Sequence, residues 1–122
     1  MEYTIKVSEN KRYILMTYKG TIDNRKAFEC SEKAQTLGKE LGINKFLIDS
    51  RNCPNEEPAA SNYNLAYKDI PNEPPAFNTI IAIVASPDDH SHDFIETVFR
   101  NTAKNVTLFR DYNEAVSYLE DQ

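Results

Sequence analysis

The densest group of side chains that could hold a metal ion is the segment Asp88–Asp93, with the sequence DDHSHD. Histidine and carboxylate side chains are good ligands for divalent metals. The spacing is unfavourable, because on a helix His90 and His92 point about 200° apart. His90 and Asp93 would meet on one helical face, but two ligands are fewer than a protein metal site uses. We therefore expect no metal and no cofactor, and interpret the segment as the acidic first turn of a helix.

Asp49 is a second candidate, because it ends an apolar run at the position where phosphoryl-accepting α/β domains carry a carboxylate nucleophile. Such a site also needs an acidic pocket after the first parallel strand and a lysine after the last one. This chain has the single Asp23 at the first position and Arg110 at the second. We expect instead that the Asp49 carboxylate accepts backbone hydrogen bonds from the loop at 52–60.

The glycines and cysteines exclude further classes of catalytic site. The chain has three glycines, at 20, 38 and 42, so it contains no GxGxxG dinucleotide loop, no phosphate-binding P-loop and no GxSxG nucleophile elbow. Without such an elbow, the serines, histidines and aspartates do not predict a catalytic triad. Cys30 and Cys53 are far apart and form no CxxC motif, so we expect reduced thiols, with Cys30 a core residue. The sequence predicts no catalytic residues.

Length and charge restrict the remaining possibilities. A chain of 122 residues predicts a single domain, residues 1–122. The net charge of −5 and the lack of a lysine- or arginine-rich cluster argue against a nucleic-acid partner. The chain shows no basic-then-apolar leader, and its longest apolar run, Ile80–Ala85, is too short to span a bilayer. We expect a cytoplasmic protein.

Hydrophobic periodicity and capping residues predict the element order β-β-α-β-α-β-α-β-α. The expected strands are residues 3–7, 12–18, 45–50, 80–84 and 105–109. Four helices are expected, each with a capping residue at its start. They begin at Thr21 or Asp23 and end at Gly42, run from Ser61 to Asp69, run from Ser86-Pro87 to Lys104, and begin at Asp111. In the first of these helices the apolar stripe is Ala27, Cys30, Ala34, Leu37 and Leu41, and in the last it is Tyr112, Ala115, Val116 and Leu119.

This order predicts an α/β fold with a single mixed, mostly parallel five-stranded sheet. The short connection at 8–11 makes the first two strands an antiparallel hairpin. The last four strands are joined by helices and should run parallel. The first strand should lie at or near an edge, where an exposed strand could pair with a second copy to give a homodimer.

Loops beyond the carboxyl ends of parallel strands are where such sheets bind ligands and partners. These loops carry polar residues of both charge signs, and Tyr63 lies next to them on the expected short helix, where aromatic side chains could form an exposed patch. The predicted partner or ligand face is Asp23, Asp49, Arg51, Asn52, Ser61, Tyr63, Asp89 and His90.

Three stretches carry a resemblance to a known family. They are FLIDSRN followed by a loop and short helix, TIIAIVASPDDHSHDFIETVF, and NVTLFRDYNEAVSYL. With the leading hairpin, this arrangement resembles, over the whole chain, the SpoIIAA-like or STAS domain family of anti-sigma-factor antagonists and sulfate-transporter tails, with its STAS/SEC14-like relatives. The resemblance implies a non-enzymatic regulatory module that docks on protein partners through the short helix and its preceding loop.

In antagonist members of that family, a serine at the start of the short helix is phosphorylated, and the added charge blocks docking. By position Ser61 is the counterpart, although the family carries an Asp-Ser-Ser-Gly-like run where this chain has Ala59-Ala60-Ser61-Asn62. Ser61 is therefore a candidate phosphorylation site and, alternatively, only a helix cap. Some relatives bind nucleotides or lipids, so the second hypothesis is a small-ligand binding protein or minor enzyme that uses Asp49, Arg51 and His90.

Overall fold

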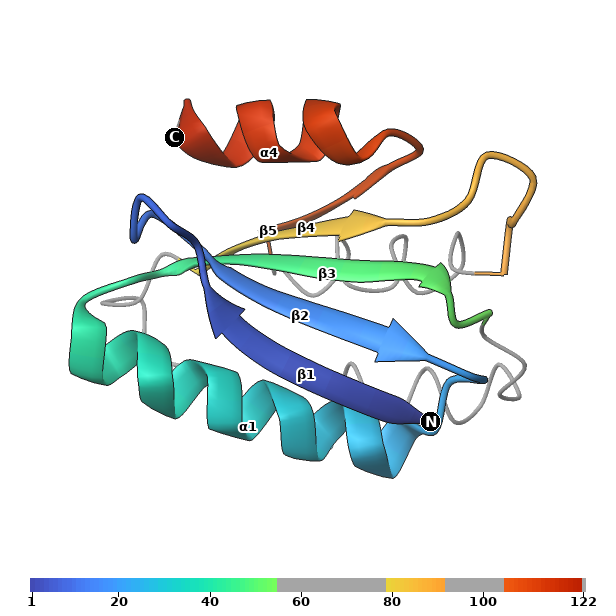
Figure 1. Cartoon of the computed structure of the whole chain (residues 1–122), viewed down its shortest axis with the longest axis horizontal. Coiled ribbons are helices and arrows are strands. Elements are labelled where there is room, and N and C mark those ends of the chain that lie inside the picture. Colours follow the sequence, from blue (N-terminus) through green and yellow to red (C-terminus); the bar gives the residue numbers. More distant parts are fainter. Residues whose placement is uncertain (55–78, 92–104, 122) are drawn as a thin grey trace.

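The computed structural model describes residues 1–54, 79–91 and 105–121 and consists of one sheet with helices on both faces (Figure 1). The elements, labelled as in Figure 1, are β1 (Glu2–Val7), β2 (Ile14–Lys19), α1 (Asn24–Leu41), β3 (Lys45–Asn52), β4 (Ile80–Val84), β5 (Asn105–Phe109) and α4 (Tyr112–Glu120). The helix expected to start at Ser61 and the proline-rich stretch after it lie outside the described residues. None of the helices in the described ranges is long and apolar enough to cross a membrane.

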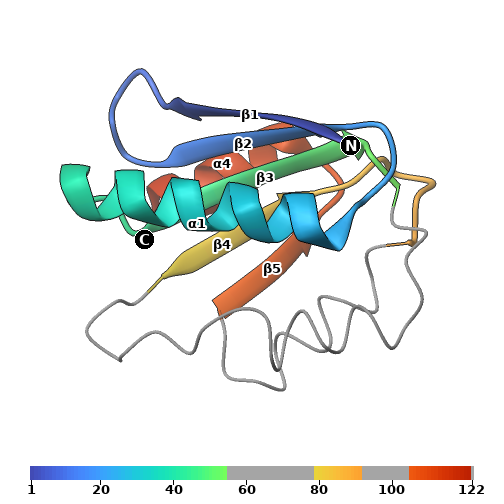
Figure 2. The ribbon, with the colours of Figure 1, turned by 90° about the horizontal axis from the view of Figure 1, so that it is seen from below.

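The five strands are hydrogen-bonded in the order β1-β2-β3-β4-β5. β1 pairs antiparallel with β2, while the pairs β2–β3, β3–β4 and β4–β5 are all parallel. The predicted mixed, mostly parallel five-stranded sheet is therefore confirmed, and so is the place of the first strand at an edge. Viewed from below, α1 crosses in front of the sheet and α4 lies behind it (Figure 2).

Helix α1 begins and ends where its capping residues predict. The Asp23 carboxylate accepts hydrogen bonds from the backbone N–H groups of Arg25 (3.0 Å) and Lys26 (3.4 Å). Gly42 ends the helix with φ of 71°, a left-handed conformation that glycine adopts without a Cβ penalty. Cys30 and Ala34 are buried against β2, as expected. The assignment of Leu41 to the core is wrong, because this last helical residue lies past the packed part of the helix and is 51% exposed.

Helix α4 also follows its prediction. The Asp111 carboxylate accepts from the Glu114 N–H (3.1 Å). Ala115 and Leu119 are fully buried, and Tyr112 and Val116 pack beside them. This face of α4 contacts the apolar side of β3 and β4, formed by Leu47, Ala82 and Val84. The fold thus has two apolar layers, one between the sheet and each helix.

Several boundaries differ from the sequence prediction. β1 begins one residue earlier, at Glu2, and β2 is Ile14–Lys19 instead of 12–18, because the N–H groups of Arg12 and Tyr13 donate to the Ser8 hydroxyl within the turn. β3 continues through Arg51 and Asn52, because the backbone of Asn52 is still paired with Lys19 of β2. The helix start at Ser86-Pro87 is wrong: residues 86–89 form a turn, in which the Ser86 carbonyl accepts from the Asp89 N–H at 3.0 Å. The Ser86 hydroxyl donates to the Arg51 carbonyl at 2.8 Å and accepts no capping hydrogen bond within the described residues.

Candidate functional site: the strand-end rim

The carboxyl ends of β2, β3, β4 and β5 lie along one border of the sheet. We call the described residues at this border, 20–23, 49–54, 85–91 and 110–112, the strand-end rim. Backbone hydrogen bonds tie its segments together: the Gly20 N–H donates to the Asn52 carbonyl (3.0 Å), and the Ala85 N–H donates to the Phe109 carbonyl (3.0 Å). The side chains of the rim are therefore carried on backbone that the sheet holds in place.

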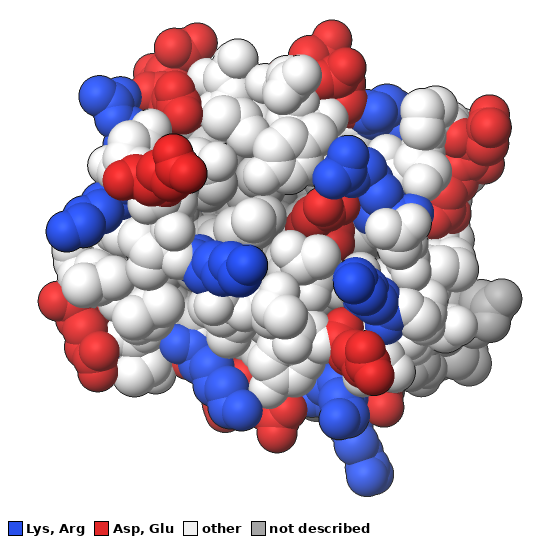
Figure 3. Space-filling view, in the orientation of Figure 1, with Lys and Arg blue, Asp and Glu red and all other residues white. Residues whose placement is uncertain are grey.

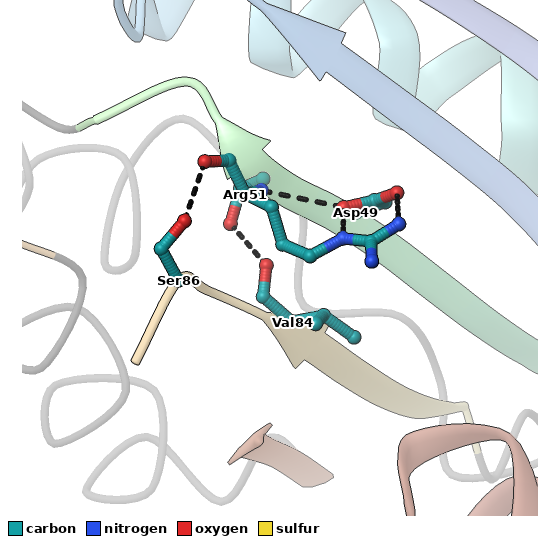
Figure 4. Close-up of polar contacts among 5 residues, drawn as sticks. Asp49, Arg51, Val84 and Ser86 are labelled. Atoms are coloured by element: carbon teal, nitrogen blue, oxygen red, sulfur yellow. Dashed lines mark hydrogen bonds and ion pairs between the residues drawn. The ribbon is translucent and has the colours of Figure 1, made fainter. Parts of the chain in front are cut away.

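Asp49 and Arg51 form the most definite polar contact of the rim (Figure 4). Two residues apart on β3, they project from the same face of the sheet. The guanidinium donates from Nε to Oδ1 and from Nη2 to Oδ2 of the carboxylate, both at 2.8 Å. The Arg51 backbone N–H also donates to Oδ1, at 3.3 Å. This bidentate geometry is the strongest form of an arginine–carboxylate pair.

The Arg51 guanidinium also lies over an aromatic ring. Its central carbon is 4.8 Å from the ring centroid of Tyr112, the first residue of α4. The hydrogen bond to Asp49 raises the pKa of Arg51 further above its ordinary value. The Arg51 side chain is nevertheless 45% exposed, whereas that of Asp49 is 13% exposed. The pair therefore presents a cation to solvent and keeps its counter-charge underneath.

This contact differs from the expectation for Asp49. Its carboxylate accepts from Arg51, on its own strand, and accepts no hydrogen bond from Asn52, Cys53 or Pro54; residues 55–60 of the expected loop lie outside the described residues. Because β3 runs on to Asn52, Asp49 lies within the strand and not at its end.

Two serines join β3 to β4 at the rim; Figure 4 labels Ser86 and the two residues whose carbonyls accept, Arg51 and Val84. The Ser50 hydroxyl, 1% exposed, donates to the Val84 carbonyl at 2.8 Å. The Ser86 hydroxyl donates to the Arg51 carbonyl, also at 2.8 Å. Both bonds cross between neighbouring strands at the point where backbone pairing ends, so the hydroxyls extend the connection between the strands by about one residue.

Arg110 organises the loop at 85–91 from the end of β5. Its Nη1 donates to the carbonyls of Ser86 (3.1 Å) and Asp89. Its Nη2 lies 3.1 Å from Nδ1 of His90. A guanidinium has no acceptor atom, so in this hydrogen bond Arg110 donates and Nδ1 of His90 accepts. The position of the His90 imidazole, which is exposed, is therefore set by Arg110.

The structure places the predicted face residues in different roles. Asp49, Arg51, Asp89 and His90 come together at the rim. Asp89 accepts there from the backbone and hydroxyl of Ser91, whereas Asp23 is used as the α1 cap. Asn52 is exposed at the end of β3. Ser61 and Tyr63 lie outside the described residues, so their part of the predicted face is not placed.

Sequence reasoning missed the participation of Tyr112. The apolar periodicity of α4 assigns it to the core, and it does pack there, but its ring also supports Arg51. The one available signal was that Tyr112 opens the helix directly after the last strand, which brings it to the same border of the sheet as Arg51.

Burial prevents the two cysteine thiols from taking part in chemistry at the rim. Cys30 and Cys53 form no disulfide and are both fully buried. Burial raises the pKa of the Cys30 thiol to about 12, although a hydrogen bond with Tyr18 lowers it in part. Burial also raises the pKa of Cys53. Because the thiolate is the reactive form, these cysteines are structural residues, as expected for Cys30.

Within residues 1–54, 79–91 and 105–121, no group of three or more histidine, cysteine or carboxylate side chains is arranged to hold a metal ion. His92 and Asp93 lie outside these ranges, so the DDHSHD segment is described only as far as Ser91.

Over the face shown in Figure 3, basic and acidic side chains are interspersed. No known protein family matches the chain, and a search of functionally characterised proteins gives no match either.

Proposed function

We propose that the chain is a non-enzymatic protein-binding module that docks on its partner through the strand-end rim. The observation that carries this proposal is the exposed Arg51 guanidinium, held by Asp49 from one side and by the ring of Tyr112 from another. Arginine and tyrosine are enriched among the residues that dominate binding energy at protein interfaces. An arginine whose geometry is already fixed loses little side-chain entropy when a partner binds.

The donors of Arg51 indicate the chemistry of the partner. A guanidinium has five N–H groups. The Nε–H and one N–H of Nη2 bond Asp49, and the others make no hydrogen bond within the described residues. The remaining donors suit backbone carbonyls or a carboxylate on the partner. They favour a partner segment rich in acceptors.

We also propose that the chain is a STAS-like module with SpoIIAA-like topology, located in the cytoplasm. The strand order, with four parallel strands and one antiparallel edge strand, supports the topology. Cys30 and Cys53 are thiols that are not joined in a disulfide, which supports a reducing compartment. In this proposal Ser61 is the phosphorylation site that would regulate docking, as the resemblance implies.

Retention of a partner by Arg51 variants tests the proposed docking surface. The affinity tag belongs at the carboxyl end, because Met1 lies at the rim, where its Sδ accepts from the Asp23 N–H at 3.5 Å. The wild-type chain should retain a partner from a lysate of its own source. Arg51→Ala should lose that partner, and Arg51→Lys should lose most of it, since lysine keeps the charge but not the planar bidentate geometry.

Arg12→Ala is the matched control, since Arg12 is an exposed arginine on the hairpin at the other end of the sheet. Its partner retention should equal that of the wild-type chain. Thermal unfolding of each variant shows whether the fold is intact. Equal retention by Arg51→Ala and Arg12→Ala contradicts docking through the rim.

A specific observation also favours the second function, the binding of a small anionic ligand such as a nucleotide or an anionic lipid headgroup. The Arg110 guanidinium donates to the Ser86 carbonyl, and the backbone carbonyl of Arg51 accepts from the Ser86 hydroxyl. The segments that carry Arg51, Arg110 and His90 are thereby joined at one border of the sheet. A ligand that binds the native state must raise its melting temperature. The absence of any such shift with nucleotides, lipids or divalent metals contradicts this alternative.

A further inference from the structure

The edge strand β1 carries three exposed side chains that have no partner within the described part of the chain. Glu2, Thr4 and Lys6 alternate with Tyr3, Ile5 and Val7, which pack on the core on the α1 side of the sheet. Among the described residues, the side chains of Glu2, Thr4 and Lys6 make no hydrogen bond or ion pair. This contrasts with the rim, where Asp49 and Arg51 are paired with each other.

The backbone of β1 shows which polar groups face outward. Ser8 donates its N–H to the Tyr13 carbonyl at 2.9 Å, so these two opposed residues form a hydrogen-bonded pair. Hydrogen-bonded and non-bonded pairs alternate along an antiparallel ladder. In the register of β1 and β2, the hydrogen-bonded pairs are therefore Lys6 with Leu15, Thr4 with Thr17 and Glu2 with Lys19. The N–H and C=O groups of Tyr3, Ile5 and Val7 consequently point away from β2, and β2 is the only described strand that pairs with β1.

We propose that this edge binds a second copy of the chain, with the two β1 strands antiparallel about a two-fold axis at Thr4. In this register Glu2 of each copy lies opposite Lys6 of the other, and Thr4 lies opposite Thr4. Tyr3 of each copy then forms a hydrogen-bonded pair with Ile5 of the other copy. These are the residues whose backbone groups point outward, so the ladder and the charge pairing require the same register.

The alternative registers lack this charge complementarity. Moving the axis to Ile5 satisfies the same backbone groups but places Lys6 opposite Thr4 and Glu2 opposite Ser8. A two-fold interface is self-complementary by definition, so every favourable pair occurs twice. The arrangement also gives each Glu2 a second neighbouring positive charge, because Lys19 of β2 already lies opposite Glu2 within its own sheet. Each glutamate would then lie between two lysines.

The α1 face of the edge is prepared for the same contact. The hydroxyl of Tyr3 donates to the Glu29 carboxylate at 2.6 Å and accepts from the Lys33 ammonium at 3.0 Å. These bonds fix the Tyr3 ring beside the position that Ile5 of the second copy would occupy. Aromatic side chains opposite β-branched ones are favourable cross-strand pairs. The interface would thus be apolar on one face of the joined sheet and charge-paired on the other.

Charge-reversal variants of the full chain test this proposal, with light scattering and sedimentation as the measurements. The wild-type chain should be a dimer that dissociates on dilution. Glu2→Lys and Lys6→Glu each place like charges opposite one another twice, and should raise the dimer dissociation constant by about tenfold or more. The double variant restores opposite charges and should dimerise like the wild-type chain. A mixture of the two single variants should form a heterodimer.

Glu40→Lys and Lys26→Glu are the matched controls, because both residues are exposed on α1. They change the net charge equally and should leave the dimer intact. A wild-type chain that is monomeric at high concentration overturns the proposal, and so does a dimer that the single variants do not weaken. The proposal is independent of docking through the rim, because the two surfaces share no residue. Arg51→Ala, which tests the rim, should remain dimeric.

Discussion

Two regions of this molecule contain residue types that could do chemistry, and their environments give them opposite properties. Beneath α1, Cys30, Cys53 and Tyr18 are almost completely buried in an apolar cluster. Burial raises the pKa of Cys30 to about 12 and that of Tyr18 well above its ordinary value, so both stay neutral. At the strand-end rim, Asp49 and Arg51 are charged, hydrogen-bonded to each other and partly open to solvent.

The difference shows that the surroundings of a side chain, more than its type, decide its use. The buried groups stabilise the fold in their neutral forms and have no access to a substrate. The charged groups of the rim keep their geometry through one another and leave donors toward solvent. The following variants and conditions test this contrast.

The largest expected effect is a loss of stability in base that originates in the buried cluster. In the unfolded chain Cys30 ionises near the ordinary thiol pKa of 9.0, whereas in the folded chain its pKa is raised to about 12. The unfolded state therefore binds fewer protons between these values, and the free energy of unfolding falls as the pH rises. Cys30 alone contributes a decrease of about 4 kcal/mol over this range, at about 1.4 kcal/mol per pH unit.

Urea unfolding of the wild-type chain and of Cys30→Ala at several pH values between 9 and 12 measures this contribution. The free energy of unfolding of the variant should fall less steeply as the pH rises. It should still fall, because the raised pKa of Tyr18 acts in the same direction. Parallel curves for the two proteins contradict the assignment of the effect to Cys30.

An intermediate effect is expected where the two regions meet, at Ser50. Its buried hydroxyl is bonded to the Val84 carbonyl. Ser50→Ala leaves that carbonyl without this donor in a place that water does not easily reach, and should lower the free energy of unfolding by about 2 kcal/mol. Ser86→Ala is the control, because its hydroxyl makes a similar bond nearer to solvent. A smaller loss for Ser50→Ala than for Ser86→Ala would contradict the argument from burial.

The smallest effect is expected at the rim itself. Asp49→Asn removes the ion pair but keeps the shape of the side chain, and should lower the free energy of unfolding by about 1 kcal/mol, because Arg51 is largely exposed. The loss should shrink in high salt. Asp88→Asn, at an exposed position on the neighbouring loop, should change little. A loss that salt does not alter indicates that packing, and not charge, holds the pair.

Local sequence signals predicted most of the fold. The alternation in β1, the caps Asp23 and Asp111, and the left-handed Gly42 each depend on residues a few positions apart, and each is confirmed. Ser86 was misleading because the segment that begins with it forms a turn whose Ser86 and Asp89 carbonyls accept from Arg110, more than twenty positions away in the chain. Propensity contains no information about such a partner.

The sequence predicted where the residues of the candidate site lie, but not which contacts they make. The parallel topology correctly brought Asp49, Arg51, Asp89 and His90 to one border of the sheet. The contacts themselves required the register of β3 against β4 and the placement of α4, which decide that Arg51 lies over Tyr112. No pattern within either segment specifies that contact.

The position of β1 at the edge of the sheet has a geometric consequence if two copies pair there as proposed. When two copies are joined through antiparallel β1 strands, each strand of one copy runs opposite to the same strand of the other copy. The two rims therefore lie at opposite ends of the joined sheet and face away from each other. Such a pair could not place both docking surfaces on one flat target. It would instead bridge two separate target molecules, one at each end of a continuous sheet, and act as a two-ended connector.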